Sequence, residues 1–244
     1  MKIVKQVCEP APTLSSNHEL PFSSHSLPHM TLEHSDLLQV VKRLRINLSD
    51  ELPGLRGHTA LAPRPRRPLL PTKDQLRQAA GLLLLYPIEN IAHTLLTVRA
   101  GSLSQHSGQV SLPGGAIEEN ETFAQAALRE TQEEVGVPTT DVHILGSLTP
   151  LQIPVSGFLL HPIVGTIYRR PTFRLAHREV DRVIEVPLTT LTNKKTLCRR
   201  WQKRDGIDID VPYFDLNGTK VWGATAMILS ELLFTLGYEL NPWK

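Results

Sequence analysis

The spacing of apolar and polar residues predicts an α/β fold from about residue 76 onward. Apolar runs at 79–88 and 93–100 have the length and composition of buried strands, and residues 87–90 form the expected turn between them. Three later segments have the same character and are also predicted to be strands: 142–151, 158–168 and 180–188. A short helical turn can follow the last of these, after Pro187.

The C-terminal part predicts a hairpin followed by a helix. Residues 211–222 are two short apolar runs around Asn217-Gly218, a pair that favours the tight turn of a β-hairpin. Residues 223–237 then form a largely apolar helical segment, and Gly237 is placed to end it.

The N-terminal third has a different composition. Residues 1–34 are rich in Ser, His and Pro without periodicity, which predicts a mobile arm. Asp36 is a candidate N-cap for a helix with a regular apolar stripe at Leu37, Val40, Val41 and Leu44. Residues 53–72 combine five prolines with four arginines, so we expect a basic linker without helix. The predicted division is an arm at 1–34, a helix and linker at 35–74, and an enzyme domain at 75–240.

Composition narrows the class of protein. Lys and Arg total 26 against 24 Asp and Glu, a net charge of +2 that does not favour nucleic acid as a partner. Two cysteines predict neither a disulfide framework nor a zinc site, which favours a reducing cytoplasm. No apolar run approaches the roughly 18 residues of a membrane span, so no membrane partner is expected. A homodimer remains an open option.

The segment 115–137 carries the candidate chemistry. Asn120 is the predicted N-cap of a helix that Gly136 ends. Glu130, Glu133 and Glu134 are spaced i, i+3 and i+4, which places them on one helical face. Three carboxylates so close repel one another unless a cation lies among them, and hard divalent cations such as Mg²⁺ prefer oxygen ligands. A solvated acidic face is the alternative.

These residues match a known pattern at fixed spacing. The segment resembles the Nudix box at Gly115, Glu121, Arg129-Glu130, Glu133-Glu134 and Gly136, with Thr131 where a bulkier apolar residue is usual. The resemblance implies a Nudix-type α/β/α sandwich with a central mixed sheet. It also implies hydrolysis of a nucleoside diphosphate derivative with Mg²⁺ or Mn²⁺.

The same resemblance assigns roles by position. The implied metal ligands are Glu130, Glu133, Glu134 and the Gly115 carbonyl. Arg129 is expected to orient these carboxylates, and Glu121 to brace the loop before the helix. Glu133, Glu134 and Arg129 therefore belong to the implied catalytic set.

A second pattern concerns the substrate. Residues 95–115 resemble the signature of the coenzyme A pyrophosphatase branch of the family, with Leu112 where phenylalanine is frequent. The matching positions are Leu95, Leu96, Thr97, Arg99, Leu103, His106, Gly108, Gln109 and Pro113-Gly114-Gly115. The segments 177–188 and 221–226 resemble that branch too. The resemblance implies cleavage of coenzyme A into adenosine 3',5'-bisphosphate and 4'-phosphopantetheine.

Four polar residues outside the box are candidates for this chemistry. Arg99, His106 and Gln109 are predicted to bind substrate, although an ion pair or a loop cap would also account for them. Glu179 is a candidate extra metal ligand or general base. Trp222 either stacks on adenine or packs in the core. The competing functions are a Nudix hydrolase of ADP-ribose or NADH, and an inactive Nudix module that senses a ligand.

Overall fold

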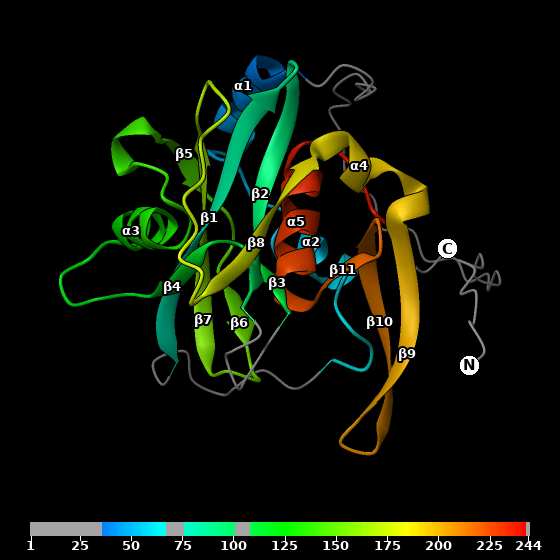
Figure 1. Ribbon diagram of the computed structural model, residues 1–244. Helices are drawn as coiled ribbons and strands as arrows, with labels where there is room; N and C mark the ends of the chain where they lie inside the picture. The colour runs from blue at the N-terminus through cyan, green and yellow to red at the C-terminus, as the bar shows by residue number, and fades with distance from the viewer. Residues whose placement is uncertain (1–35, 67–75, 101–107, 243–244) are drawn as a thin grey trace.

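The computed structural model describes residues 36–66, 76–100 and 108–242 (Figure 1). Its main sheet has the strand order β3-β2-β1-β7-β5, with β4 added on β1, β6 on β7 and β8 on β2. The strands are β1 (Arg77–Ile88), β2 (Ile91–Arg99), β3 (Val110–Ser111), β4 (Gly114–Ala116), β5 (His143–Ser147), β6 (Leu151–Ile153), β7 (Phe158–Thr166) and β8 (Val180–Pro187). The sheet is mixed, because β1 and β7 are parallel whereas their other neighbours are antiparallel.

Within the described ranges, five α-helices accompany the sheets: α1 (Leu37–Asn47), α2 (Leu55–Ala60), α3 (Phe123–Val135), α4 (Leu188–Thr192) and α5 (Gly223–Thr235). Short 3-10 turns occupy Thr139–Asp141 and Lys194–Thr196. The predicted start of α1 is confirmed, because the Asp36 carboxylate accepts a hydrogen bond from the Leu38 N–H at 3.1 Å. The expected turn after Pro187 is α4.

Alternate residues of β1 divide the core into two layers. Leu82 and Leu84 pack in the cluster that contains Ala126 and Ala127 of α3. Leu83, on the other face, joins the cluster that contains α5 and the apolar stripe of α1. Helices thus cover both faces of the mixed sheet, which is the α/β/α sandwich expected from the sequence (Figure 1). No helix in the described ranges is long and apolar enough to cross a membrane.

A second sheet holds the predicted hairpin and a strand that was not predicted. Asn217 and Gly218 both have positive φ angles, 52° and 89°, and join β10 (Ile207–Leu216) to β11 (Thr219–Trp222), as expected. β9 (Leu197–Arg204) was missed because its sequence, LCRRWQKR, is mostly polar. It forms a strand because it pairs with β10 along its whole length.

The expectation of a helix-free linker at 53–72 is wrong, because α2 lies within it. The prolines flank this helix at Pro53 and Pro63 instead of interrupting it. α2 is held against α5, where the Ser230 hydroxyl donates to the Gly57 carbonyl at 2.8 Å. A Cβ on Gly57 would lie 2.8 Å from the Glu231 Cα, so only glycine allows this approach. Tertiary contact stabilises a helix too short to persist alone.

Two further expectations need comment. The predicted strand at 142–151 is two strands, β5 and β6, and the pairing of β5 with β7 shifts register between Ile144 and Gly146. The arm predicted at 1–34 lies outside the described residues.

Candidate active site

The helix that carries the glutamates begins two residues later than expected. Thr122, and not Asn120, is the N-cap of α3, because its hydroxyl accepts from the Gln125 N–H at 3.2 Å while the Gln125 side chain accepts from the Thr122 N–H. Asn120 instead has a left-handed backbone with φ of 64°. The motif Thr-x-x-Gln was available in the sequence as a capping box. The predicted end is confirmed, since Gly136 is left-handed with φ of 73°.

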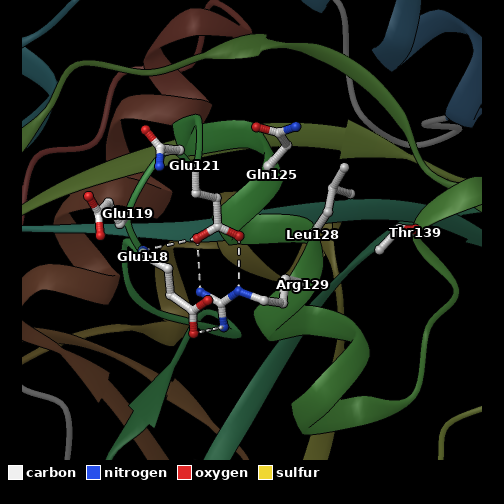
Figure 2. A pocket seen from close by; sticks show the side chains of 8 residues that line it. Glu118, Glu119, Glu121, Gln125, Leu128, Arg129 and Thr139 are labelled. Carbon is white, nitrogen blue, oxygen red and sulfur yellow. Dashed lines mark hydrogen bonds and ion pairs between the residues drawn. The ribbon is translucent and has the colours of Figure 1, made fainter.

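Arg129 is the centre of an ion-pair network on α3. Its Nε and Nη2 atoms donate to the two oxygens of Glu121 at 2.9 and 3.0 Å, a bidentate pair (Figure 2). Its Nη1 donates to Glu130 at 2.9 Å and Glu133 at 3.1 Å. The Ala116 carbonyl accepts a further bond at 3.2 Å. Arg129 therefore ties the loop before the helix to two of the predicted metal ligands.

The glycine turn before α3 lies directly against the carboxylates. A Cβ on Gly115 would come within 2.3 Å of a Glu130 oxygen. A Cβ on Gly114 would come equally close, at 2.3 Å, to the Ala80 carbonyl of β1. The backbone of β4 is thus confined between β1 and α3, and side chains at either position would separate these elements. This accounts physically for two adjacent glycines at this point of the sequence.

Glu134 has the most unusual environment in the site. Its side chain is buried, with 6% of the residue exposed, and its Oε2 atom has no hydrogen-bond partner among the described residues. Burial raises the pKa of the Glu134 carboxyl to about 8, and the charges of Glu130 and Glu179 act in the same direction. The charge of Arg99 and a bond from the Gly114 N–H oppose this shift only in part. Burial also raises the pKa of Glu130, despite its pairing with Arg129.

The loop that carries Glu179 is bound to the end of α3. The Ala176 N–H donates to the Glu134 carbonyl at 2.9 Å, and the Glu179 N–H donates to the Ala176 carbonyl at 2.8 Å. On its other side, the Glu179 carbonyl accepts from the Ala100 N–H at 2.9 Å. Glu179 is therefore positioned between α3 and the end of β2, which explains its electrostatic influence on both Glu130 and Glu134.

Two of the three predicted substrate-binding residues meet at this end of β2. The Arg99 N–H donates to the Gln109 carbonyl at 3.0 Å, and the Gly108 N–H donates to the Arg99 carbonyl at 3.2 Å. These bonds bring together the two described segments that end at residue 100 and begin at residue 108. His106, the third predicted residue, lies outside the described residues.

The carboxylate oxygens in this region are suitable ligands for a divalent cation, but they do not converge on one point. A buried, unpartnered Glu134 oxygen among other carboxylates is an arrangement that a cation stabilises. Glu130 and Glu133 point toward Arg129 instead. Accordingly, no three acidic, His or Cys side chains in the described ranges form a ready ligand group.

A pocket of about 440 Å³ lies beside this network (Figure 2). Its lining comprises Glu118, Glu119, Asn120, Glu121, Gln125, Leu128, Arg129 and Thr139. The pocket therefore borders the Glu121–Arg129 pair, whereas Glu130, Glu134 and Glu179 are not part of its lining. We locate the candidate chemistry at the carboxylates and not in this pocket.

Several known proteins have sequences similar to this chain. The NUDIX domain model matches residues 76–199. A protein of Pectobacterium atrosepticum, called uncharacterized Nudix hydrolase NudL, is 37% identical over 172 residues, which cover 68% of this chain and 85% of that protein. Its namesake from Klebsiella pneumoniae is 36% identical over 195 residues, 79% and 96% of the two chains. A solved MutT protein from Methanosarcina mazei Go1 has a TM-score of 0.44 at 17% identity, covering 67% of this chain and 96% of that one.

The chain belongs to the Nudix family. It is a Nudix hydrolase, a pyrophosphatase that acts on small nucleoside diphosphate derivatives, and enzymes of this family generally use divalent metal cations.

Proposed function

We propose that this enzyme hydrolyses the diphosphate of coenzyme A or of its acylated derivatives. The products are adenosine 3',5'-bisphosphate and 4'-phosphopantetheine or its acyl form. The observation that carries the proposal is the meeting of Arg99 and Gln109 beside Glu179 and the buried Glu134. Arg99 and Gln109 belong to the segment 95–115, which resembles the coenzyme A branch.

Glu130, Glu133, Glu134 and the Gly115 carbonyl would hold Mg²⁺ or Mn²⁺. When bound, such an ion offsets the negative charge of the diphosphate and lowers the pKa of water. Oxygen ligands on one helix and one glycine turn suit either of these hard cations.

Arg129 and Glu121 act on this site by positioning. Their bidentate pair holds the loop before α3 in register with the helix. Arg129 also neutralises Glu130 and Glu133 while no cation is bound, so that the three-carboxylate face does not unfold the helix by repulsion. A lysine in its place could not form the same bidentate bond.

Arg99, Gln109 and His106 would bind the substrate. Arg99 introduces a positive charge beside Glu134, and a guanidinium pairs well with phosphate oxygens.

Glu179 either joins the metal ligands or takes the proton from the attacking water. Glu179→Gln separates these roles. It should lower kcat at every metal concentration if Glu179 is the base, and should raise the metal concentration needed for half-maximal turnover if Glu179 is a ligand.

The test is a comparison of catalytic efficiencies. Coenzyme A, its 3'-dephospho form, ADP-ribose and NADH are assayed with Mg²⁺, with Mn²⁺ and with a chelator, and products are identified by mass. We expect coenzyme A to have the highest kcat/KM and the chelator to abolish turnover. A tenfold or greater advantage for ADP-ribose or NADH contradicts the coenzyme A assignment and leaves the broader Nudix activity. An inactive, ligand-sensing module is the outcome if no diphosphate is cleaved.

A further inference from the structure

Four side chains on one face of the second sheet form a cationic and aromatic cluster, comprising Arg200, Tyr213, Lys220 and Trp222. The guanidinium carbon of Arg200 lies 5.4 Å from the centre of the Trp222 ring and 5.9 Å from that of Tyr213. The Lys220 Nζ atom lies 5.2 Å from the Tyr213 ring centre. Two cations therefore flank one buried tyrosine. Trp222 is half-buried and carries Arg200 on its ring, so it is not simply a core residue.

Strand register places this cluster away from the main core. Tyr213 lies opposite Trp222 on β11 and Cys198 on β9, so these residues share one row across the sheet. Phe214 and Val221, on the alternate positions, face the other way and are buried in the main core. The cluster thus occupies the opposite face of the sheet, where Lys220 and Arg200 are half-buried.

The cations of the cluster have no ion-pair partner among the described residues. Asp215 lies opposite Lys220 in register, but its Oδ1 atom accepts from the Gly218 N–H at 2.6 Å. Arg199, the neighbour of Arg200 on the opposite face, pairs with the buried Asp210. In contrast, no ion pair joins Arg200 or Lys220 to a carboxylate within the described residues. The Nε atom of Arg200 is buried and has no hydrogen-bond acceptor there. Aromatic faces stabilise a cation but do not accept its N–H groups in the way an oxygen does. A desolvated guanidinium with an unused donor favours an anionic ligand.

The cluster belongs to an element that packs next to the candidate active site. β11 lies beside β3, which leads directly into the 113–115 turn (Figure 1). The Thr225 hydroxyl, just after β11, donates to the Val110 carbonyl of β3 at 2.8 Å. Arg182 of β8 donates to the Thr219 hydroxyl at the start of β11 at 3.2 Å. The hairpin that carries the cluster is therefore fixed directly to the strand that leads into the turn.

We propose that the Arg200–Lys220 cluster binds a phosphomonoester on the nucleoside end of the substrate, distinct from the diphosphate that is cleaved. This inference rests on the proposed function, which supplies a substrate with such a group. Stacking on Trp222 and Tyr213 fixes the guanidinium in advance, so little side-chain freedom is lost on binding. A substrate without the phosphomonoester leaves two half-buried cations unpaired. The enzyme therefore prefers substrates that carry this group.

The experiment measures KM and kcat for coenzyme A and for its 3'-dephospho form. In Arg200→Gln and in Lys220→Gln, we expect KM for coenzyme A to rise roughly tenfold, the loss of one charge-assisted bond, with kcat nearly unchanged. KM for the dephospho form should change less than twofold. Lys203→Gln is the matched control, because Lys203 is an exposed cation on β9 whose register places it on the opposite face. It should behave as wild type with both substrates.

Equal KM changes for the two substrates, or no change in either variant, overturn the inference. Melting temperatures identify a variant that is merely destabilised, and Lys220→Gln serves if Arg200→Gln folds poorly. If the wild-type enzyme cleaves neither substrate, the proposed function has failed and the cluster is tested by calorimetry instead. Adenosine 3',5'-bisphosphate should then bind the wild type at least tenfold more tightly than AMP, and Arg200→Gln should remove that preference. Equal binding of the two nucleotides rejects the cluster as a phosphate site.

Discussion

Two buried glutamates, Glu231 and Glu134, have opposite surroundings. Glu231 on α5 is fully buried, and both of its oxygens have partners. One accepts from the Gly54 and Thr149 N–H groups at 3.1 and 3.2 Å, and the other lies 2.7 Å from the His58 Nε2 atom. This carboxylate joins α2, α5 and the segment before β6, and both of its oxygens form hydrogen bonds within the protein.

Glu134 on α3 is buried without such partners. Its Oε2 atom is unbonded within the described residues, and its neighbours Glu130 and Glu179 carry the same charge. The contrast shows that burial of a carboxylate does not define its role. A buried carboxylate with hydrogen-bond partners on both oxygens holds the fold together. A buried carboxylate that lacks a partner and lies among like charges is available to a ligand.

The largest effect is expected for Glu134→Gln. Removing a charge from the cation site should lower kcat/KM by on the order of a hundredfold or more, since transition-state stabilisation is lost. The melting temperature should not fall, because the amide is uncharged, like the protonated carboxyl that this buried position favours. Turnover and melting are measured on the same preparations. Glu119→Gln, an exposed glutamate nearby, is the control, and a Glu134 variant with normal rates would reject the metal-site assignment.

Glu231→Gln should show the reverse behaviour. The amide replaces charge-assisted bonds with neutral ones and presents a donor to His58, so we expect a loss of about 2 kcal/mol in the free energy of unfolding. Activity per folded molecule should be unchanged. Chemical denaturation measures the loss, with Glu239→Gln as the matched control, because the Glu239–Arg56 pair is exposed. A variant of normal stability but reduced kcat would refute the structural role.

The pH dependence of stability should report on the buried carboxyl of Glu134. Burial raises the pKa of Glu134 from 4.5 to about 8, so the folded state favours its protonated form. Its contribution to stability is therefore complete below pH 4.5 and is lost as the pH rises through about 8. In a chelator, the wild-type melting temperature should fall between pH 5 and 8, and Mg²⁺ should restore it most at high pH. Glu134→Gln should reduce both trends, and an unchanged slope in that variant contradicts the assignment.

The smallest effect is expected from deleting residues 1–34. Their sequence lacks the apolar periodicity of a packed element, so stability and kcat/KM should change little. Thermal melting and steady-state kinetics test this directly. A fall of many degrees in the melting temperature would show that the segment packs on the enzyme domain. Its contribution would then come from apolar contacts, unlike that of either glutamate.

Local patterns in the sequence predicted most of the elements that frame the site. Buried runs placed β1, β2, β7 and β8, and Asn217-Gly218 placed the hairpin, because these features depend on neighbours in the chain. The spacing of Glu130, Glu133 and Glu134 indicated a shared helical face for the same reason. Gly136 likewise predicted the end of α3. A left-handed backbone ends the helix there, and glycine adopts that conformation readily.

Tertiary structure decided what depends on residues far apart. α2 and β9 form because α5 and β10 stabilise them, which neither local sequence reveals. The difference between Glu134 and Glu231 also arises outside their own helices. The charge of Glu179 acts on Glu134, whereas His58 forms a hydrogen bond with Glu231. Periodicity assigns a side chain to a face, but the groups brought against that face by the fold determine whether its bonds are satisfied. That long-range arrangement therefore separates a structural carboxylate from a reactive one.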